Sequence, residues 1–241
     1  MRIDVLTLFP EACEPFFSAS ILGRANRSGL VTIACHNIRD YTDDPHRKVD
    51  DRPFGGGPGM VMMCQPVFDA VAAVEKLDPR PAKRVLLCPQ GRRLDQRLAE
   101  EFARVDRLLL IAGHYEGFDE RIRIGLEPME VSVGDYVLSG GEAAAMVVVD
   151  AVARLVPGVL GHEDSARQES FAVLASADQA PCLEYPQYTR PREFRGLSVP
   201  DVLIGGDHAK IDRWRVEQAI ARTKDRRPDL LRECETDNRR V

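Results

Sequence analysis

Three stretches of this 241-residue chain share one pattern: an apolar run, a loop that contains glycine, and then a helical segment. They are residues 85–91, 108–117 and 131–141. In a parallel α/β sheet such loops gather at the carboxyl ends of the strands, where ligands bind. Glycine there allows positive φ and a close approach of the backbone to a ligand. The pattern predicts one composite pocket, although each loop alone is also compatible with an ordinary strand-to-helix turn.

Apolar periodicity predicts the elements around these loops. We expect strands at residues 2–9, 31–38, 85–88, 108–112 and 129–133, and helices at residues 10–26, 66–76, 95–105, 119–125 and 141–155. Strands that alternate with helices at this spacing indicate a mainly parallel α/β sheet. A further helix at residues 208–223 has an apolar stripe and predicts a small, mostly helical C-terminal domain.

Composition changes along the chain suggest three parts. We expect an α/β domain at residues 1–161, a flexible interdomain linker at residues 162–186 and a C-terminal domain at residues 187–241. Residues 187–227 hold ten Lys or Arg and six Asp or Glu, about +4, whereas the whole chain carries −5. This fits selective RNA contact by the C-terminal domain, and it also fits a solvated helical face of mixed charge.

Several classes of protein are disfavoured. The longest apolar runs are too short to span a bilayer, and the N-terminus lacks the features of a signal peptide, so we expect a cytoplasmic protein without a membrane partner. The six cysteines show no Cys-x-x-Cys spacing, and the five histidines form no compact ligand set. We therefore expect neither a disulfide framework nor a protein-built metal site.

Further motifs extend the pattern over nearly the whole chain. They are IDVLTLFP at residues 3–10, VDDRPFGGGPGM at 49–60, RLVPGVLG at 154–161 and YTRP at 188–191. Together with the three loops, they closely resemble the tRNA (guanine-N1)-methyltransferase (TrmD) family of the SPOUT superfamily. The resemblance implies methyl transfer from S-adenosylmethionine to N1 of the tRNA guanosine 3′-adjacent to the anticodon, position 37. It also implies a deep trefoil knot and a homodimer with active sites shared between subunits, whereas composition and periodicity predict no knot.

The resemblance implies that the three loops bind the cofactor mainly through backbone groups. Residues 134–138 would read the adenine edge, Glu116 would face a positive group, and Tyr115 and Tyr136 would wall the pocket. The expected cofactor-binding residues are Leu87, Pro89, Gly91, Gly113, Tyr115, Glu116, Ser132, Val133, Gly134, Asp135, Tyr136, Val137, Leu138, Gly140 and Gly141.

The chemistry of guanine N1 requires two further groups. This nitrogen carries a proton at neutral pH, so methylation needs a general base, and negative charge developing on O6 needs a stabilising group. The resemblance implies that Arg154 is catalytic and contacts the target guanine. The family's usual Glu-Asp-Ser-Phe is Gln-Glu-Ser-Phe at residues 168–171, so Glu169 replaces the aspartate base. Asp164 and Asp178 are alternative bases.

The glycine-rich loop at residues 55–59 lacks the Gly-Lys-Ser/Thr ending of a phosphate-binding P-loop. The resemblance instead assigns it to the wall of the target-base site. The expected substrate-binding residues are His46, Asp50, Arg52, Gly55, Gly59, Ser165 and Ser170. Mg²⁺ dependence is implied by the resemblance alone, since the sequence shows no dedicated ligand cluster for the ion.

Three alternative functions stay open at this point. A SPOUT enzyme that methylates a ribose hydroxyl would not need Glu169. A non-catalytic RNA-binding module would use the α/β domain only for dimerisation, which intact loops and Arg154 argue against. A dinucleotide-dependent oxidoreductase is disfavoured because the chain lacks Gly-x-Gly-x-x-Gly.

Overall fold

The computed structural model describes residues 1–161, 169–171 and 181–231. The chain divides into two compact units, residues 1–161 and residues 162–241, and each is considered by itself. The predicted linker, residues 162–186, falls largely outside the described residues, so its flexibility stays a prediction. None of the described helices combines the length and the apolar character that a bilayer crossing requires.

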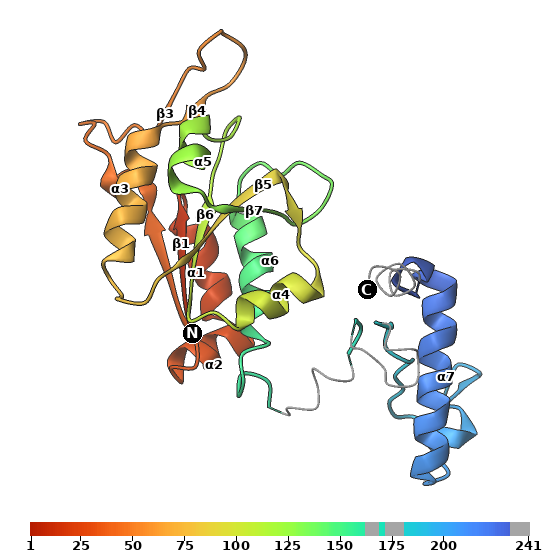
Figure 1. The fold of residues 1–241 in the computed structure, drawn as a ribbon. Helices are drawn as coiled ribbons and strands as arrows, with labels where there is room; N and C mark the ends of the chain where they lie inside the picture. The colour runs from red at the N-terminus through yellow and green to blue at the C-terminus, as the bar shows by residue number, and fades with distance from the viewer. Residues whose placement is uncertain (162–168, 172–180, 232–241) are drawn as a thin grey trace, which may run out of the picture. The chain divides into compact units, whose positions relative to one another are not determined.

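The first unit is built on a five-stranded sheet in the order β2-β1-β6-β5-β7 (Figure 1). Every pair of neighbouring strands is parallel, so the predicted mainly parallel α/β sheet is confirmed. The central strand β6 is buried at every residue, as expected for a parallel strand that is covered on both faces. The strands are β1 (Arg2–Thr7), β2 (Thr32–Asn37), β5 (Lys83–Arg93), β6 (Arg107–Ala112) and β7 (Met129–Ser132).

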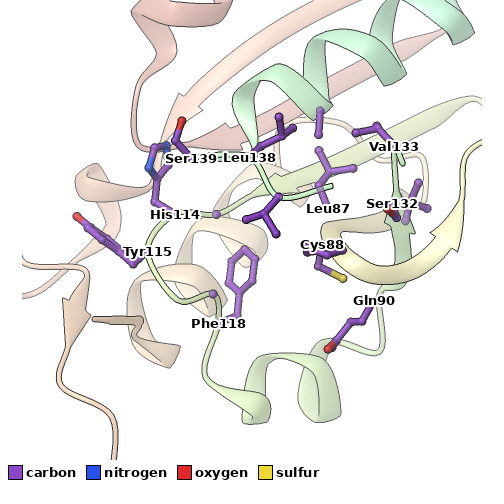
Figure 2. Close-up of a pocket in the computed structure, with 18 of the residues that line it drawn as sticks. Leu87, Cys88, Gln90, His114, Tyr115, Phe118, Ser132, Val133, Leu138 and Ser139 are labelled. Carbon is purple, nitrogen blue, oxygen red and sulfur yellow. The ribbon is translucent and has the colours of Figure 1, made fainter. Parts of the chain in front are cut away.

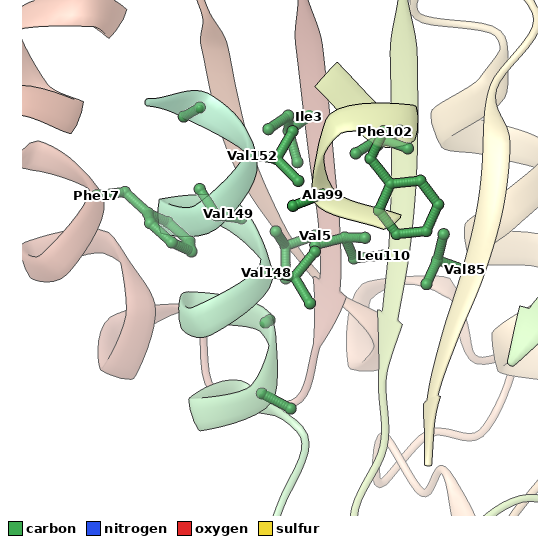
Figure 3. Packing of buried hydrophobic residues seen from close by; sticks show 14 of the residues in the cluster. Ile3, Val5, Phe17, Val85, Ala99, Phe102, Leu110, Val148, Val149 and Val152 are labelled. Atoms are coloured by element: carbon green, nitrogen blue, oxygen red, sulfur yellow. The ribbon is translucent and has the colours of Figure 1, made fainter. Parts of the chain in front are cut away.

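Helices cover both faces of this sheet, because successive apolar side chains of a strand point to opposite faces. Leu108 and Leu110 of β6 belong to one buried cluster, and Leu109 and Ile111 belong to the other. The first cluster, shown in Figure 3, is covered by α1 (Pro10–Ser18), α2 (Ser20–Arg27), α4 (Gln96–Ala103) and α6 (Glu142–Ala153). The second is covered by η1 (Ile38–Tyr41), α3 (Cys64–Glu75) and α5 (Glu120–Leu126).

The prediction of one continuous helix near the N-terminus is wrong. The helix expected at residues 10–26 is interrupted at Ala19, whose backbone is extended with ψ 158°. α1 and α2 meet closely there: a Cβ added to Gly23 would lie 1.9 Å from the carbonyl oxygen of Ser18. Only glycine fits that approach without a backbone shift.

A buried ionic network fastens the sheet at β1 and β6. Arg107 is almost fully buried, donates from Nε to Asp4 Oδ2 at 3.1 Å, and donates from Nη2 to the carbonyl oxygen of Val74 at 2.6 Å. Asp4 also contacts Arg2 at 2.8 Å and His36 Nε2 at 2.9 Å. Burial raises the pKa of Asp4, but the hydrogen bonds with His36 and Arg2 outweigh it and bring the pKa down to about 2.

The second unit is organised around the 19-residue helix α7 (His208–Arg226). The amide of Leu183 donates to Thr223 Oγ1 at 2.9 Å, which fastens the preceding segment to this helix. Trp214 is half-buried beside Tyr188, with ring centroids 6.4 Å apart. The remaining elements are β8 (Glu193–Phe194), β9 (Leu197–Ser198) and η2 (Asp201–Leu203).

Candidate functional site

The irregular middle of β5 and the loops that follow β6 and β7 line a cavity of about 370 Å³ (Figure 2). This volume lies in the range of small-molecule and cofactor sites. Thirteen of the fifteen predicted cofactor residues line it: Leu87, Pro89, Gly113, Tyr115, Glu116, Ser132, Val133, Gly134, Tyr136, Val137, Leu138, Gly140 and Gly141. The structure thus brings the three glycine-bearing loops to one place, as their shared pattern predicts.

Gly91 and Asp135 are the two predicted cofactor residues that do not line the cavity. The strand expected to end at residue 88 continues to Arg93, because Leu87 and Arg92 both pair with Val131 and the four residues between them bulge outward. A Cβ on Gly91 would lie 2.3 Å from the backbone nitrogen of Val131. Gly91 therefore allows the strand to rejoin β7, and Asp135 is exposed on the third loop.

Two other glycines permit close contacts, one within the second loop and one between the second and third loops. A Cβ on Gly113 would lie 2.3 Å from the ring of Phe118. A Cβ on Gly141 would lie 2.7 Å from the Cα of Ala112 and 2.9 Å from the nitrogen of Gly113. The amide of Gly141 also donates to the Gly113 carbonyl at 2.8 Å. The second and third loops therefore touch backbone to backbone at the base of the cavity.

Sequence reasoning missed several residues of the cavity wall. Figure 2 shows one of them, Phe118, between the loops, with the missed His114 and the predicted Tyr115 on one side and the missed Gln90 on the other. Of the missed residues, His114 lies 2.6 Å from Glu142 at the start of α6. His114 lies in the second of the three stretches and Glu142 directly follows the third, but nothing in their spacing of 28 positions indicates that they meet.

A second polar cluster holds the first loop in place. Glu130 on β7 accepts hydrogen bonds from Cys88 Sγ at 3.0 Å, Gln90 Nε2 at 3.1 Å and Arg123 Nε at 2.9 Å. Burial and the bond to Glu130 raise the pKa of Cys88 to about 11, so its thiol stays protonated and donates. A glutamate inside an apolar strand was the available sequence signal for this cluster.

The glycine-rich loop is joined to the cavity wall at its base. It connects β3 (Asp50–Asp51) with β4 (Val61–Met62), which pair antiparallel. The amide of Glu116 donates to the carbonyl oxygen of Met60 at 2.9 Å, and a Cβ on Gly59 would lie 2.2 Å from Glu116 Oε1. Of the predicted substrate residues, Gly59 thus meets the wall and Asp50 lies half-buried on β3. His46, Arg52 and Gly55 are exposed and do not line the cavity.

Within one chain, the structure does not bring Arg154 to this cavity. Arg154 caps the C-terminal end of α6, and 13 residues of helix at 1.5 Å each separate it by about 20 Å from Gly141. It lines a different hollow of about 560 Å³, together with Phe16, Met146, Val147 and other residues.

The other predicted residues belong to the second unit. Glu169 is half-buried, and Ser170 Oγ accepts a hydrogen bond from the amide of Glu184 at 3.1 Å. Ser165 and the alternative bases Asp164 and Asp178 lie outside the described residues. Across residues 1–161, 169–171 and 181–231, no group of three or more His, Cys, Asp or Glu side chains is arranged to hold a metal ion.

Comparison with known proteins decides the family. The profile of the family described as tRNA (Guanine-1)-methyltransferase TrmD matches residues 1–233. The chain belongs to this family. The resemblance found in the sequence motifs is confirmed, and with it the methyltransferase class of the protein.

Individual relatives match this chain in sequence over almost their full length. The chain is 55% identical over 239 residues to a tRNA (guanine-N(1)-)-methyltransferase of Rhodopirellula baltica, covering 99% of this chain and 97% of the relative. It is 54% identical to the protein of the same name from Moorella thermoacetica, over 96% of this chain and 90% of that one. It is 52% identical to the corresponding protein of Dehalococcoides mccartyi, again over 96% and 90%.

Proposed function

We propose that the protein transfers a methyl group from S-adenosylmethionine to N1 of the guanosine at position 37 of tRNA. The observation that carries the proposal is the cavity formed by three glycine loops, in a chain that matches the TrmD family over residues 1–233. The names of the relatives supply the substrate class, a guanine N1 of tRNA. The names of the relatives fit neither a ribose methyltransferase nor a non-catalytic RNA-binding module.

The cavity suits the proposed methyl donor. Its wall combines apolar side chains such as Leu87, Leu138 and Phe118 with backbone groups of the glycine loops, which suits a purine ring and its polar edge. The carboxylate of Glu116 suits a positively charged sulfonium or amino group. S-adenosylmethionine supplies an activated methyl group on its sulfonium. The proposal includes the trefoil knot that the family resemblance implies for these three loops.

We assign the proton transfer to Glu169. Its carboxylate would accept the N1 proton, which leaves the N1 electron pair free for attack. Arg154 would donate hydrogen bonds to guanine O6 and stabilise the negative charge that develops there. Glutamate has one methylene more than the aspartate of the family, so the backbone at residue 169 would lie correspondingly farther from the base.

A homodimer belongs to the same proposal, because the site is incomplete in a single chain. Arg154 lies about 20 Å along α6 from the cavity. The hollow beside it is lined by apolar side chains that remain open: Phe16 is 42% exposed and Val147 is 49% exposed. We propose that a second copy packs on this surface with twofold symmetry. A partner subunit would then bring an Arg154 to each cavity, which a single chain does not do.

The C-terminal unit is the proposed tRNA-binding domain. Its support is the local charge of about +4 over residues 187–227 and the hairpin of β8 and β9. At the hairpin, Phe194 is 58% exposed, Leu197 is 74% exposed, and the Arg195 guanidinium lies 5.1 Å from the Phe194 ring centroid. An open aromatic ring beside a cation suits a nucleic-acid base and its phosphate.

Two further expectations complete the proposal. The proposal names no protein ligand for Mg²⁺, because the described residues include no group of three His, Cys, Asp or Glu side chains that could hold the ion. The cytoplasm is the proposed compartment, since the five cysteines among the described residues are free, as is usual for proteins of reducing compartments.

The proposal is tested by incubating the protein with labelled S-adenosylmethionine and total tRNA, followed by nucleoside analysis. We expect label in 1-methylguanosine. Label in a 2′-O-methylated nucleoside would support the ribose alternative, and no label in any nucleoside would refute the proposed activity. A parallel reaction with EDTA tests the Mg²⁺ expectation, and light scattering tests the dimer.

A further inference from the structure

A buried carboxylate ties three distant segments of the chain together beside the cavity. Glu142 is the first residue of α6 and is only 7% exposed. Thr7 Oγ1, at the end of β1, donates a hydrogen bond to Glu142 Oε1. His114 Nε2, just after β6, lies 2.6 Å from Glu142 Oε2. Since the carboxylate can only accept, the His114 nitrogen carries the proton in this contact.

The contact between Glu142 and His114 sits directly against the third loop. A Cβ on Gly140 would lie 2.3 Å from His114 Nε2 and 2.6 Å from Glu142 Oε2. His114 and Gly140 also form an antiparallel backbone bridge. The amide of Gly141 donates to the carbonyl of Gly113 at 2.8 Å. The side-chain contact thus reinforces the backbone contact between the second and third loops.

Aromatic side chains fix the orientation of the His114 ring. Phe9 meets it edge-on with centroids 4.9 Å apart, and Tyr115 meets it edge-on at 6.1 Å. A ring held from two sides loses little further freedom when it makes the contact with Glu142. A buried carboxylate is costly unless it is paired and hydrogen-bonded, so Thr7 and His114 together explain how Glu142 is tolerated at this place.

We infer that Glu142 and His114 are positioning residues for the methyl donor. Their contact locks the second loop to the third, so that the backbone of Gly113, Gly140 and Gly141 keeps the shape that the donor needs. This inference rests on the proposed function, because it takes the cavity to be the S-adenosylmethionine site. Glu142 acts through the loops and touches no reacting atom.

The experiment measures S-adenosylmethionine affinity by calorimetry for Glu142→Gln, His114→Leu and His114→Gln. A hydrogen bond to a charged group contributes about 1.5–3 kcal/mol, so its loss weakens affinity by roughly 10- to 100-fold. Glu142→Gln and His114→Leu should show that loss. His114→Gln keeps an N–H donor of similar reach and should restore affinity to within about threefold of wild type.

A matched control is available in the same unit. Glu75 forms a comparable charged contact, with Oε1 2.7 Å from Arg84 Nε and Oε2 2.9 Å from Arg84 Nη2. Arg84 lies at the start of β5, and neither Glu75 nor Arg84 lines the cavity. Glu75→Gln makes the same chemical change and should leave the affinity for the donor unchanged.

Steady-state kinetics separate positioning from general destabilisation. Positioning raises KM for S-adenosylmethionine and leaves KM for tRNA unchanged, whereas a loss of folded protein lowers kcat and moves neither KM. The double variant Glu142→Gln/His114→Leu should be no weaker than the worse single variant, because both changes remove one contact.

The outcomes are distinguishable from those of the proposed function. Donor binding by the wild-type protein, with unchanged affinity in both Glu142→Gln and His114→Leu, overturns the inference alone. An affinity loss that matches the unfolded fraction in thermal melts also overturns it. Absence of donor binding by the wild-type protein overturns the proposed function and the inference together. If Glu142→Gln does not fold, His114→Leu carries the test, since the His114 side chain is 19% exposed.

Discussion

Replacement of Gly141 by alanine tests the loop contact at the base of the cavity. The added Cβ would lie 2.7 Å from Ala112 Cα, 2.9 Å from Ala112 Cβ and 2.9 Å from the nitrogen of Gly113. Favourable contacts between carbon atoms occur at about 3.5–4.0 Å, so the third loop must retreat by roughly 1 Å. Two of the three atoms belong to the backbone, and rotation of a side chain cannot relieve those contacts.

The magnitude follows from the cost of overpacking. Inserting a methyl group into a packed site costs about 1–3 kcal/mol. For a protein of this size, each kcal/mol lowers Tm by about 2–4 °C, so we expect a fall of roughly 2–12 °C. The retreat also strains the hydrogen bond from Gly141 to Gly113, which measures 2.8 Å. S-adenosylmethionine affinity should therefore fall on the order of tenfold or more.

Calorimetry with S-adenosylmethionine and thermal unfolding measure the two effects in the same samples. Gly161→Ala is the matched control, because a Cβ there would meet nothing within 4 Å. It should leave both quantities unchanged. Unchanged donor affinity and unchanged Tm in Gly141→Ala would refute the packing of the two loops and the placement of the pocket.

Three further predictions concern stability, chemistry and RNA binding. The pKa of Asp4 is lowered from 3.8 to about 2, so the ionised Asp4 contributes about 2 kcal/mol to stability above pH 4. This contribution is lost as pH falls towards 2. Urea unfolding should show the loss in the wild-type protein and not in Asp4→Asn. Glu169→Gln should slow single-turnover methyl transfer about 10²- to 10⁴-fold with unchanged donor affinity; a wild-type rate would direct attention to Asp164 or Asp178. Phe194→Ala should weaken tRNA binding by about 1–3 kcal/mol, while Leu77→Ala, which removes another exposed apolar side chain, should not; equal affinities would exclude base stacking at the hairpin.

The sheet and the cavity are largely predictable because their signals are local. Each buried strand is a short apolar run. The second and third loops carry a glycine just after the strand, whereas Gly91 of the first stretch lies within β5. In a parallel sheet this order places the loops at the same edge, which is why residues such as Leu87, Gly113 and Leu138 line one cavity.

Features that depend on how neighbouring elements pack were not predictable. The break at Ala19 depends on how closely Gly23 approaches Ser18, which helix periodicity does not report. The continuation of β5 depends on both Leu87 and Arg92 pairing with Val131, and a local apolar pattern ends before that second pairing.

The two proposed catalytic residues illustrate the same limit. Motifs point to Arg154 and Glu169 by resemblance, but they do not report how far either residue lies from the cavity. Along α6 alone, Arg154 is about 20 Å from the loop at Gly141. Sequence motifs therefore suggest the chemistry of these residues and do not supply their geometry.

The central claim is that the methyl group goes to N1 of guanosine 37. The most direct measurement uses two tRNA transcripts that differ only in having G or A at position 37, incubated with the wild-type protein and S-adenosylmethionine. Nuclease digestion and mass spectrometry should locate one methyl group at position 37 in the first transcript, in 1-methylguanosine, and none in the second. Equal methylation of both transcripts, or a methyl group at another position or on a ribose, would contradict the account.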